Sequence, residues 1–374
     1  MAKLGEVCEV LDSKRVPITA ANRVSGQYPY YGANGVQDYV ADYIFDDELV
    51  LLAEDGGNFG SKEKPIAYRV SGKCWVNNHA HVLKPKAVID VDYLCYSLMF
   101  YDVSGLVNGA TRQKLTQSDM RKMEIPLRTM VEQKNIVCRL NKLTELISLR
   151  KQQLAKLDEL VKARFVEMFG DLASPACPWK KEKIVNICAD QDDIKCGPFG
   201  TQLSKDEYQS TGVAVWEIPQ INSNFLLKPT HFITAEKALQ LESYSIIPGD
   251  IAMSRKGNVG RCAVFPENLK NGTIHSDVLR IRIDKKRAVP TFMMHQLHNS
   301  NFIKHQIELV SSGAIMAGIN VTKLKEIEVH LPPLTLQNEF AAFVERVDQQ
   351  KQTIQQSLEK LELMKKALMQ EYFG

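Results

Sequence analysis

One long segment occurs twice in this 374-residue chain, and this repeat constrains the fold more than any other feature. Residues 120–170 align without gaps on residues 324–374, and both copies end in Phe-Gly. The two copies share these identical pairs: Glu124/Glu328, Leu127/Leu331, Gln133/Gln337, Leu154/Leu358, Lys156/Lys360, Leu157/Leu361, Lys162/Lys366, Ala163/Ala367 and Glu167/Glu371. A repeat of this length indicates that the protein consists of two similar halves.

Each copy predicts a short strand, a turn and then a long amphipathic helix. Within the helix, mostly apolar residues recur at alternating spacings of four and three, which is the seam of a coiled coil. In the first copy the seam positions are Ile136, Leu140, Leu143, Ile147, Arg150, Leu154, Leu157, Val161, Arg164 and Met168. In the second copy they are Phe340, Val344, Val347, Lys351, Ile354, Leu358, Leu361, Lys365, Leu368 and Tyr372. At about 1.5 Å per residue, each helix is expected to form a rod of roughly 50 Å.

The two helices are expected to pair with each other. The charged seam positions of the copies do not coincide, since Arg150 and Arg164 correspond to Ile354 and Leu368. A helix that paired with its own copy would place like charges face to face, which is costly. The first helical segment is also net basic and the second net acidic. The alternative is that two ordinary amphipathic helices are buried separately.

Composition indicates a soluble, cytoplasmic protein. The content of hydrophobic residues is 44%, no apolar run is long enough to cross a bilayer, and the N-terminus does not have the form of a signal peptide. The eight cysteines are scattered without a CxxC pair, as is typical of reduced thiols. A net charge of +3 does not by itself signal nucleic-acid binding. If the protein binds DNA, local basic patches or partner subunits must supply the remaining charge.

The segments between the repeats are expected to be two globular domains, at residues 1–119 and 171–323. Short strands, Gly/Asn turns and few helices predict a β-rich mixed architecture for each. In the first domain we expect a buried strand at Leu49–Ala53, a glycine-rich loop at Glu54–Pro65 and a helix at Asp92–Tyr101. A turn near residue 33 is expected to use left-handed backbone at Gly32, Asn34 and Gly35.

The second domain repeats this plan with lower similarity. Gly249–Ser254 and the loop that follows correspond to Glu48–Ala53 and its glycine-rich loop. The sequence His275-Ser-Asp-Val-Leu aligns with His79-Ala-His-Val-Leu, which places Asp277 opposite His81. We further expect a helical stretch at Thr291–Glu308 and, at Asp171–Trp179, a linker from the first long helix.

The order domain–helix–domain–helix resembles the specificity subunits of type I restriction-modification systems. Six motifs carry the resemblance, over nearly the whole chain: Tyr30–Val36, Gly109–Leu115, Cys196–Leu203, Ser254–Gly260, Ser312–Asn320 and Leu331–Gln337. The chain departs from the family pattern at Leu127-Arg-Thr-Met, where the second copy has Leu331-Pro-Pro-Leu. The resemblance implies an α+β fold, with two similar β-rich target-recognition domains and two long helices that form an antiparallel coiled coil.

The resemblance also implies a function without catalysis by this chain. Each domain would read one half of a bipartite site in double-stranded DNA, while the paired helices would set the spacing and dock two modification subunits. Those subunits would bind S-adenosylmethionine and methylate adenine, and restriction subunits would use ATP and magnesium. A coiled-coil scaffold whose domains bind protein partners instead of DNA is the alternative.

Motifs for autonomous catalysis are missing from the sequence. Pro332-Pro333 lacks the polar and aromatic neighbours of an adenine methyltransferase motif, and no GxxxxGK[ST] phosphate loop is present. His79 and His81 could share a metal ion, but no matching Cys/His pair lies near them in the sequence. We therefore interpret these histidines, and the pair His295 and His298, as structural.

Candidate DNA contacts are polar and basic residues in the glycine-rich loops and near the domain starts. In the first domain they are Lys14, Arg15, Tyr31, Asn34, Asn58, Lys62 and Arg112; in the second they are Lys195, Gln202, Lys205, Arg255, Lys256, Asn258 and Arg261. Arginine and asparagine can bond base edges at two points, whereas lysine more often contacts phosphate. The competing interpretation of any one of them is a solvated loop residue, and Tyr31 and Asn34 could instead shape a turn.

Overall fold

The chain forms two compact units in a computed structural model that describes residues 1–109, 112–311 and 318–374. The first unit comprises Met1–Gln152 and Gln355–Gly374, and the second comprises Gln153–Ile354. Parts of two motifs noted above, at residues 110–111 and 312–317, lie outside the described residues. Among the described residues, no helix is both long and apolar enough to span a membrane.

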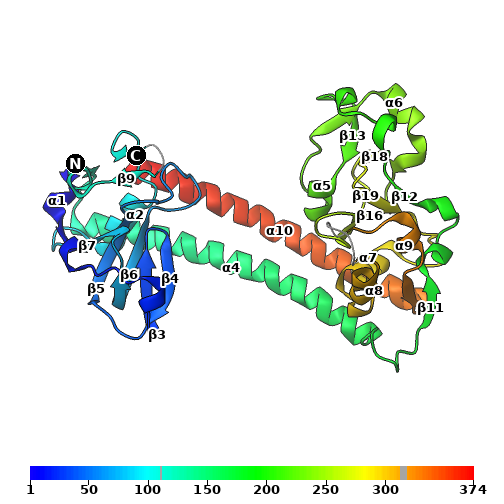
Figure 1. Ribbon diagram of the computed structural model, residues 1–374, viewed down its shortest axis with the longest axis horizontal. Helices are drawn as coiled ribbons and strands as arrows, with labels where there is room; N and C mark the ends of the chain where they lie inside the picture. The colour runs from blue at the N-terminus through cyan, green and yellow to red at the C-terminus, as the bar shows by residue number, and fades with distance from the viewer. Residues whose placement is uncertain (110–111, 312–317) are drawn as a thin grey trace. The chain divides into compact units, whose positions relative to one another are not determined.

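The first unit is built around a six-stranded sheet, drawn in blue shades in Figure 1. Its order is β2 (Cys8–Val10), β7 (Ala80–Pro85), β5 (Phe45–Ala53), β6 (Ala67–Val76), β3 (Ser25–Gly32) and β4 (Gly35–Val40). Strand β5 ends in an uninterrupted apolar run because both of its faces are covered. Val50 and Leu52 join the cluster that includes α2 (Val91–Met99), whereas Leu49 and Leu51 join a second cluster on the other face. The expected β-rich mixed domain is confirmed.

Short elements complete this unit. The N-terminal strand β1 (Ala2–Lys3) pairs with β10 (Glu124–Ile125), and β8 (Val107–Asn108) pairs with β9 (Lys114–Leu115). Helices α1 (Leu4–Val7) and α3 (Gln117–Lys122) pack beside each other. The pairing of β1 with β10 ties the start of the chain to the entry of the first long helix.

The turn between β3 and β4 differs from the expectation. Only Gly35 has a positive φ there, of 103°, whereas Gly32 and Asn34 do not. A Cβ at Gly32 would lie 2.1 Å from the amide nitrogen of Gln37, so this flexible side chain would have to move to admit a larger residue. Asn34 instead uses its amide nitrogen to donate a hydrogen bond to the carbonyl oxygen of Gly56, 2.9 Å away.

The second unit contains two four-stranded sheets. One has the order β12 (Ile194–Cys196), β19 (Val278–Ile281), β16 (Ile251–Ser254) and β17 (Cys262–Val264). The other has the order β14 (His231–Ile233), β13 (Val213–Trp216), β18 (Gly272–Ile274) and β15 (Ser245–Ile246). A separate pair joins β11 (Lys180–Lys183) to β20 (Glu328–Leu331), which immediately precedes the second long helix.

The helices of the second unit include a break that the sequence analysis missed. The unit contains α5 (Ile218–Asn222), α6 (Ala235–Gln240), α7 (Pro290–Asn299), α8 (Asn301–Ser311) and α9 (Val321–Lys325). The single helical stretch expected at Thr291–Glu308 is thus two helices. The chain turns at Ser300, a buried residue with extended backbone that caps the end of α7.

Strand pairing corrects the alignment of the two domains around residue 277. The backbone N–H of Glu54 donates to the carbonyl of His79, and the backbone N–H of Arg255 donates in the same way to Asp277. The structural counterpart of Asp277 is therefore His79, not His81. Repeated apolar residues in both segments made an alignment shifted by two residues equally acceptable, because a shift by two preserves the faces of a strand.

The two repeats form 40-residue helices that run antiparallel, α4 (Met130–Phe169) and α10 (Leu334–Phe373) (Figure 1). Within the first unit, Lys151 forms an ion pair with Glu362 at 2.9 Å. Within the second unit, Asp158 pairs with Lys351 at 2.7 Å and Arg164 with Glu339 at 3.1 Å. The residue numbers of the partners decrease along α10 as those along α4 increase. The expected antiparallel coiled coil is therefore confirmed, and the alternative that the two helices are buried separately is excluded.

The seam positions lie on the inner faces of these helices. All the seam positions given above are buried or half-buried in both copies, including the charged ones. Both helices also begin at the same point of the repeat, Met130 and Leu334, although one is preceded by Leu-Arg-Thr and the other by Leu-Pro-Pro. The departure from the family pattern therefore leaves the length of the turn unchanged.

The segment after α4 is packed against the end of that helix. Gly170 ends the helix with a φ of 76°, and Leu172 is buried in the core of the second unit. The indole nitrogen of Trp179 donates to the carbonyl oxygen of Phe169 at 2.8 Å. The expected linker at Asp171–Trp179 is thus held against the helix that it follows.

Candidate nucleic-acid interface

Three of the predicted contacts in the first domain, Asn34, Asn58 and Arg112, form hydrogen bonds to or within the loop that follows β5. Besides the bond from Asn34 to Gly56, Arg112 donates from Nη2 to Oδ1 of Asp55 at 2.9 Å. Asn58 lies within the loop, with its amide nitrogen 3.5 Å from the carbonyl oxygen of Pro65. The loop thus brings together side chains that are distant in the sequence.

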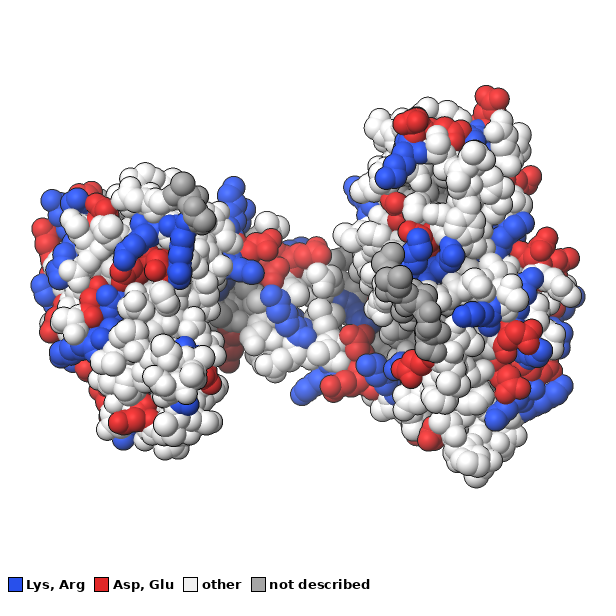
Figure 2. All heavy atoms as spheres, in the orientation of Figure 1, with Lys and Arg blue, Asp and Glu red and all other residues white. Residues whose placement is uncertain are grey.

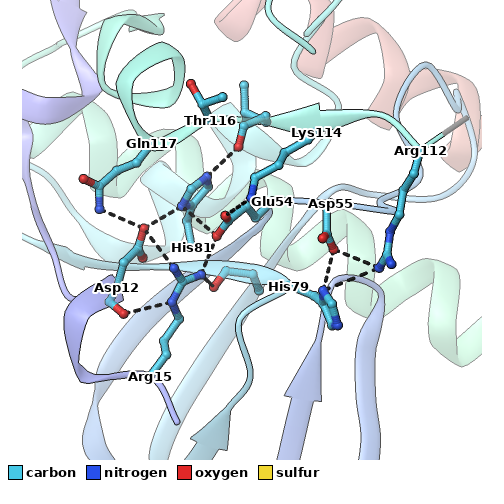
Figure 3. A network of polar contacts seen from close by, with 12 residues as sticks. Asp12, Arg15, Glu54, Asp55, His79, His81, Arg112, Lys114, Thr116 and Gln117 are labelled. Carbon is cyan, nitrogen blue, oxygen red and sulfur yellow. Dashed lines mark hydrogen bonds and ion pairs between the residues drawn. The ribbon is translucent and has the colours of Figure 1, made fainter. Parts of the chain in front are cut away.

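A buried polar network lies beneath this loop (Figure 3). Arg15 donates from Nη1 to Glu54 at 2.6 Å and to the carbonyl oxygen of Ala80 at 2.7 Å. Lys114 reaches the other carboxylate oxygen of Glu54 at 3.0 Å. Although burial alone would raise the pKa of Glu54, the hydrogen bonds from Arg15 and Lys114 hold this pKa below its usual value. Arg15 therefore fixes the start of the domain to the base of the loop.

The same network contains Asp12 and His81. The Nδ1 atom of His81 lies 2.6 Å from Asp12, and its Nε2 atom lies 2.9 Å from the carbonyl oxygen of Leu115. Burial would raise the pKa of Asp12, but the hydrogen bond with His81 and the charge of that ring lower it. Among the described residues, Asp12, Glu54 and His81 are the one set with the spacing of metal ligands. However, both ring nitrogens of His81 already face acceptors, and Arg15 already neutralises the carboxylates.

The remaining candidates of the first domain differ in exposure. Lys14 and Lys62 are exposed, Lys14 next to the buried network and Lys62 on the glycine-rich loop. Tyr31 is half-buried against the apolar cluster of β5 and β6, and burial raises the pKa of its hydroxyl. Its packing is that of a residue that shapes the β3–β4 turn.

In the second domain, Arg255 holds loops together. Its Nε atom donates to the carbonyl oxygen of Ile319 at 3.2 Å, and Nη1 donates to that of Ser276 at 3.3 Å. The guanidinium also lies 4.9 Å from the ring centre of Phe199. Arg261 is similarly engaged, with Nη1 2.9 Å from His298 and Nη2 3.0 Å from Asn224.

The other candidates of this domain are more accessible. Lys256 is exposed and forms an ion pair with Asp277 at 2.8 Å. Asn258 is an exposed loop residue, and Lys205 is exposed at the start of a short 3-10 helix (Lys205–Glu207). The ammonium of Lys195 lies 5.3 Å from the ring centre of Tyr244. The exposed Gln202 accepts a hydrogen bond from the hydroxyl of the same tyrosine at 3.1 Å.

The structure also reveals a polar cluster that the sequence analysis did not identify. Glu217 and His275 directly follow β13 and β18, which are parallel neighbours, so their side chains meet at one edge of the sheet. Glu217 lies 2.7 Å from His231, whose ring stacks on Tyr208, and 4.0 Å from His275. A polar residue directly after each of two strands was the available signal, but the parallel pairing was not predictable.

Charged side chains do not form a continuous basic band on the face shown in Figure 2. On that face the described lysines and arginines are interspersed with acidic residues over both units. On this face, charge alone would therefore attract DNA only weakly.

Comparisons with known proteins agree with this architecture. A sequence model of the type I restriction modification DNA specificity domain matches residues 1–159 and again residues 193–363. Together these matches cover most of the chain. The chain belongs to the type I restriction-modification specificity family. The first match contains the described strands of the first unit, the second contains β12 to β20 but not β11, and each reaches into one of the long helices.

Relatives of this specificity subunit span nearly its whole length. A protein of Haemophilus influenzae, described as a type I restriction enzyme specificity subunit, is 27% identical over 92% of this chain and 86% of its own. The MjaVIII specificity subunit of Methanocaldococcus jannaschii is 20% identical over 99% of this chain and 90% of its own. The crystal structure of an S subunit from M. genitalium covers 100% of this chain and 95% of its own, with a TM-score of 0.64 and 15% identity.

Apart from the half-buried Tyr31, Asn58 and Lys195, the predicted contacts of the specificity subunit fall into two groups. Arg15, Arg255 and Arg261 are held by several protein acceptors at the bases of loops. Residues with exposed side chains form the second group: Lys14, Asn34, Lys62, Arg112, Gln202, Lys205, Lys256 and Asn258. The second group has the accessibility that a contact to DNA requires, and its role in binding stays a prediction.

Proposed function

We propose that each of the two domains reads one half of a bipartite site in double-stranded DNA. The observation that carries this proposal is the double match to the specificity domain, once in each unit. In the first domain, loop side chains such as Asn34 and Arg112 are held by hydrogen bonds at the surface. Side chains fixed in this way can contact base edges with a smaller entropic cost.

The helix pair is proposed to set the spacing between the two half-sites. Each long helix contributes residues to both units, since the division falls after Gln152 in α4 and after Ile354 in α10. Ion pairs at Lys151–Glu362 and Asp158–Lys351 fix the register of the pair on both sides of this division. A change in helix length would therefore change the distance between the domains.

The outer faces of the helices are proposed to dock two modification subunits. Large apolar side chains remain exposed there although the seam is filled: Val131, Leu149, Leu160, Val166, Leu363 and Met364. Exposed apolar residues that gather along an element are typical of protein interfaces. Their burial by partners would also explain a low solubility of this chain when it is made alone.

Chemistry is proposed to reside on the partner subunits, in the cytoplasm. Modification subunits would supply S-adenosylmethionine, and restriction subunits would supply ATP and magnesium. The buried set Asp12, Glu54 and His81 supports this division of labour, because Arg15 and Lys114 use its carboxylates in ion pairs. The present chain would contribute recognition and assembly.

Methylated-motif mapping of cells that contain this chain and a modification subunit tests the proposal. The exposed loop variants Lys62→Ala and Asn258→Ala form a matched pair, one in each domain. We expect each to weaken or relax one half-site, and the two halves to differ, while the spacer stays constant. If both variants altered the same half, the assignment of one domain to one half-site would be wrong. If the assembled complex retained no specific DNA, the domains would be protein-binding modules.

A further inference from the structure

Arg112 is held at the surface of the first domain by the carboxylate of Asp55, and its Nη2 atom also lies 3.4 Å from Nδ1 of His79 (Figure 3). Its Nη2 atom donates to Asp55 at 2.9 Å, and its side chain is 58% exposed. The guanidinium also lies directly over Gly56, where a Cβ atom would be only 3.1 Å from Nε. Glycine with a φ of 62° at this position thus leaves room for the arginine.

Asp55 is itself held by a second residue, His79, at the same oxygen. Its Oδ1 atom lies 2.5 Å from Nδ1 of His79, and the backbone N–H of His79 donates to Asn77 at 2.8 Å. Because a carboxylate accepts, Nδ1 of His79 carries the proton in this contact. The adjoining backbone is also bonded, since the N–H of Gly56 donates to the carbonyl oxygen of Gln113 at 3.2 Å.

The other predicted arginines do not have this arrangement. Arg15 is only 12% exposed and bonds to Glu54 and Ala80. Arg255 and Arg261 are half-buried and bond to several carbonyl or side-chain acceptors. Only Arg112 among these combines an exposed guanidinium with one anchoring carboxylate. It therefore retains donors that can face a ligand.

A guanidinium fixed at one nitrogen presents its remaining N–H groups in a rigid planar fork. This fork matches the N7 and O6 acceptors of guanine in the major groove, and lysine lacks its fixed planar geometry. A carboxylate that holds the arginine before binding reduces the side-chain entropy lost on binding. Phosphate contacts, in contrast, need a positive charge but not this fixed geometry.

The equivalent place in the second domain has the opposite polarity. Lys256 stands where the first domain has Asp55, since Lys256 bridges to Gly318 as Asp55 bridges to Lys114. Asp277 stands where the first domain has His79, and it forms the ion pair with Lys256. At this position the second domain therefore has a lysine, whereas the first domain has the aspartate that holds Arg112. The two surfaces present different hydrogen-bonding groups and are suited to different base edges.

We propose that Arg112 reads a guanine in the half-site of the first domain, and that Asp55, fixed by His79, is the residue that positions it. This inference rests on the proposed function, in which the domains read DNA. It assigns a base to one residue and gives Asp55 a role in specificity that acts through Arg112.

The test uses the full chain assembled with its modification subunits and begins with the methylated motif of the wild type. Duplexes that carry 7-deazaguanine at each guanine of the motif in turn remove one N7 acceptor at a time. One position is expected to weaken wild-type binding, and Arg112→Ala is expected to lose this sensitivity. Arg112→Ala should reduce discrimination of that guanine from other bases by about 5- to 150-fold.

Four further variants separate the reading of a base from effects on folding and on charge. Arg112→Lys should keep non-specific affinity but not guanine discrimination. Asp55→Asn should reduce discrimination without an equal loss of non-specific affinity, and the double variant with Arg112→Ala should add nothing further. Lys256→Ala in the second domain should leave the guanine position unchanged. The melting temperature of each complex serves as the check on folding.

Several results would overturn the inference and leave the proposed function intact. One is a first-domain half-site without guanine, and another is an unchanged motif in Arg112→Ala. A third is equal weakening on all sequences that Arg112→Lys restores, which would make Arg112 a phosphate contact. Loss of all specific DNA binding by the wild-type complex would instead remove the proposed function itself.

Discussion

Two buried glutamines show why particular residues of the repeat are identical. Gln133 and Gln337 stand at the same place in α4 and α10, and both are fully buried. Gln133 accepts from the backbone N–H of Asp90 at 2.8 Å, and Gln337 accepts from that of Val289 at 2.9 Å. Each amide thus satisfies backbone at the entry of a domain helix, α2 or α7, and ties that helix to a long helix. An apolar residue would leave these buried groups unpaired, which costs about 1–3 kcal/mol.

His295 gives the second unit a specific sensitivity to acid. Burial, and then the nearby charges of His298 and Lys351, lower the pKa of His295 to about 4. Its ring packs against Phe340 of α10, and its Nε2 atom is buried without a hydrogen-bond partner among the described residues. The folded state therefore keeps this ring neutral at pH values at which the unfolded chain, with a pKa near 6.5, takes up a proton.

We expect the stability of the second unit to fall as the pH drops from about 6.5 to about 4 and then to level off with respect to this group. The loss amounts to at most about 3 kcal/mol from His295, by the linkage between pKa and folding. His295→Phe should flatten the decline, whereas the exposed His305→Gln should not. Urea unfolding at a series of pH values measures this difference. An equal acid sensitivity in wild type and His295→Phe would show that the ring is not buried as described.

At the residue scale, the sequence located the loops but did not reveal what each residue does in them. The glycine-rich loops at residues 54–65 and 255–261 were predictable, because glycine, asparagine and lysine follow a buried strand. The roles of Arg15 and Arg255 were not, since their partners Ala80 and Ile319 are backbone carbonyls distant in the sequence. Asp55 and Glu217 were missed as site residues because their neighbours are set by strand pairing alone.

At the element scale, the longest elements were the most predictable. A spacing of four and three that persists along each repeat leaves one helical phase, so the seam was clear from the sequence. Shorter elements contain too few repeats of an apolar pattern to favour a single interpretation. The break at Ser300 was missed because both flanking segments are amphipathic and no proline or glycine marks the boundary. The shift by two residues near Asp277 has the same origin, namely a short strand whose apolar pattern fits two registers.

The helix pair offers a direct test of the spacing proposal. One heptad would be inserted into each helix between the Lys151–Glu362 and Asp158–Lys351 ion pairs. Seven residues preserve the seam and add about 10 Å. This corresponds to about three base pairs of B-form DNA. We expect a methylated motif with the same half-sites and a longer non-specific spacer.

A matched control inserts the heptad into α4 alone. This change lengthens α4 but not α10, so the residues that face each other across the pair no longer correspond beyond the insertion. It should therefore abolish activity or folding instead of lengthening the spacer. If the double insertion changed the half-sites and kept the original spacer, the helices would not set the distance. Methylated-motif mapping distinguishes the two outcomes in a single experiment.

At the scale of the whole molecule, the end of the chain completes the core of the first unit. Phe373 lies 5.1 Å from Tyr93 of α2, measured between ring centres, in an edge-on contact. Tyr372 is buried, and its hydroxyl accepts a hydrogen bond from Arg139 at 3.1 Å. The core of the first domain therefore includes residues from the last helix, although its strands all lie near the start of the chain. Both halves depend on the last helix, because β20 and the start of α10 pack in the second unit.

We therefore expect a chain that ends at residue 323 to lose stability in the first domain, although every strand of that domain is present. Hydrogen exchange of the β5 amides should become much faster than in the full chain. Addition of a peptide spanning residues 324–374 should restore part of the protection.

Phe373→Ala in the full chain should have a smaller effect in the same direction, roughly 2 kcal/mol for a half-buried aromatic side chain. The exposed Leu363→Ala should leave β5 protection unchanged and weaken only the binding of modification subunits. Unaltered protection of β5 in the truncated chain would mean that the first domain folds alone, and that the contacts of Tyr372 and Phe373 contribute little to its stability.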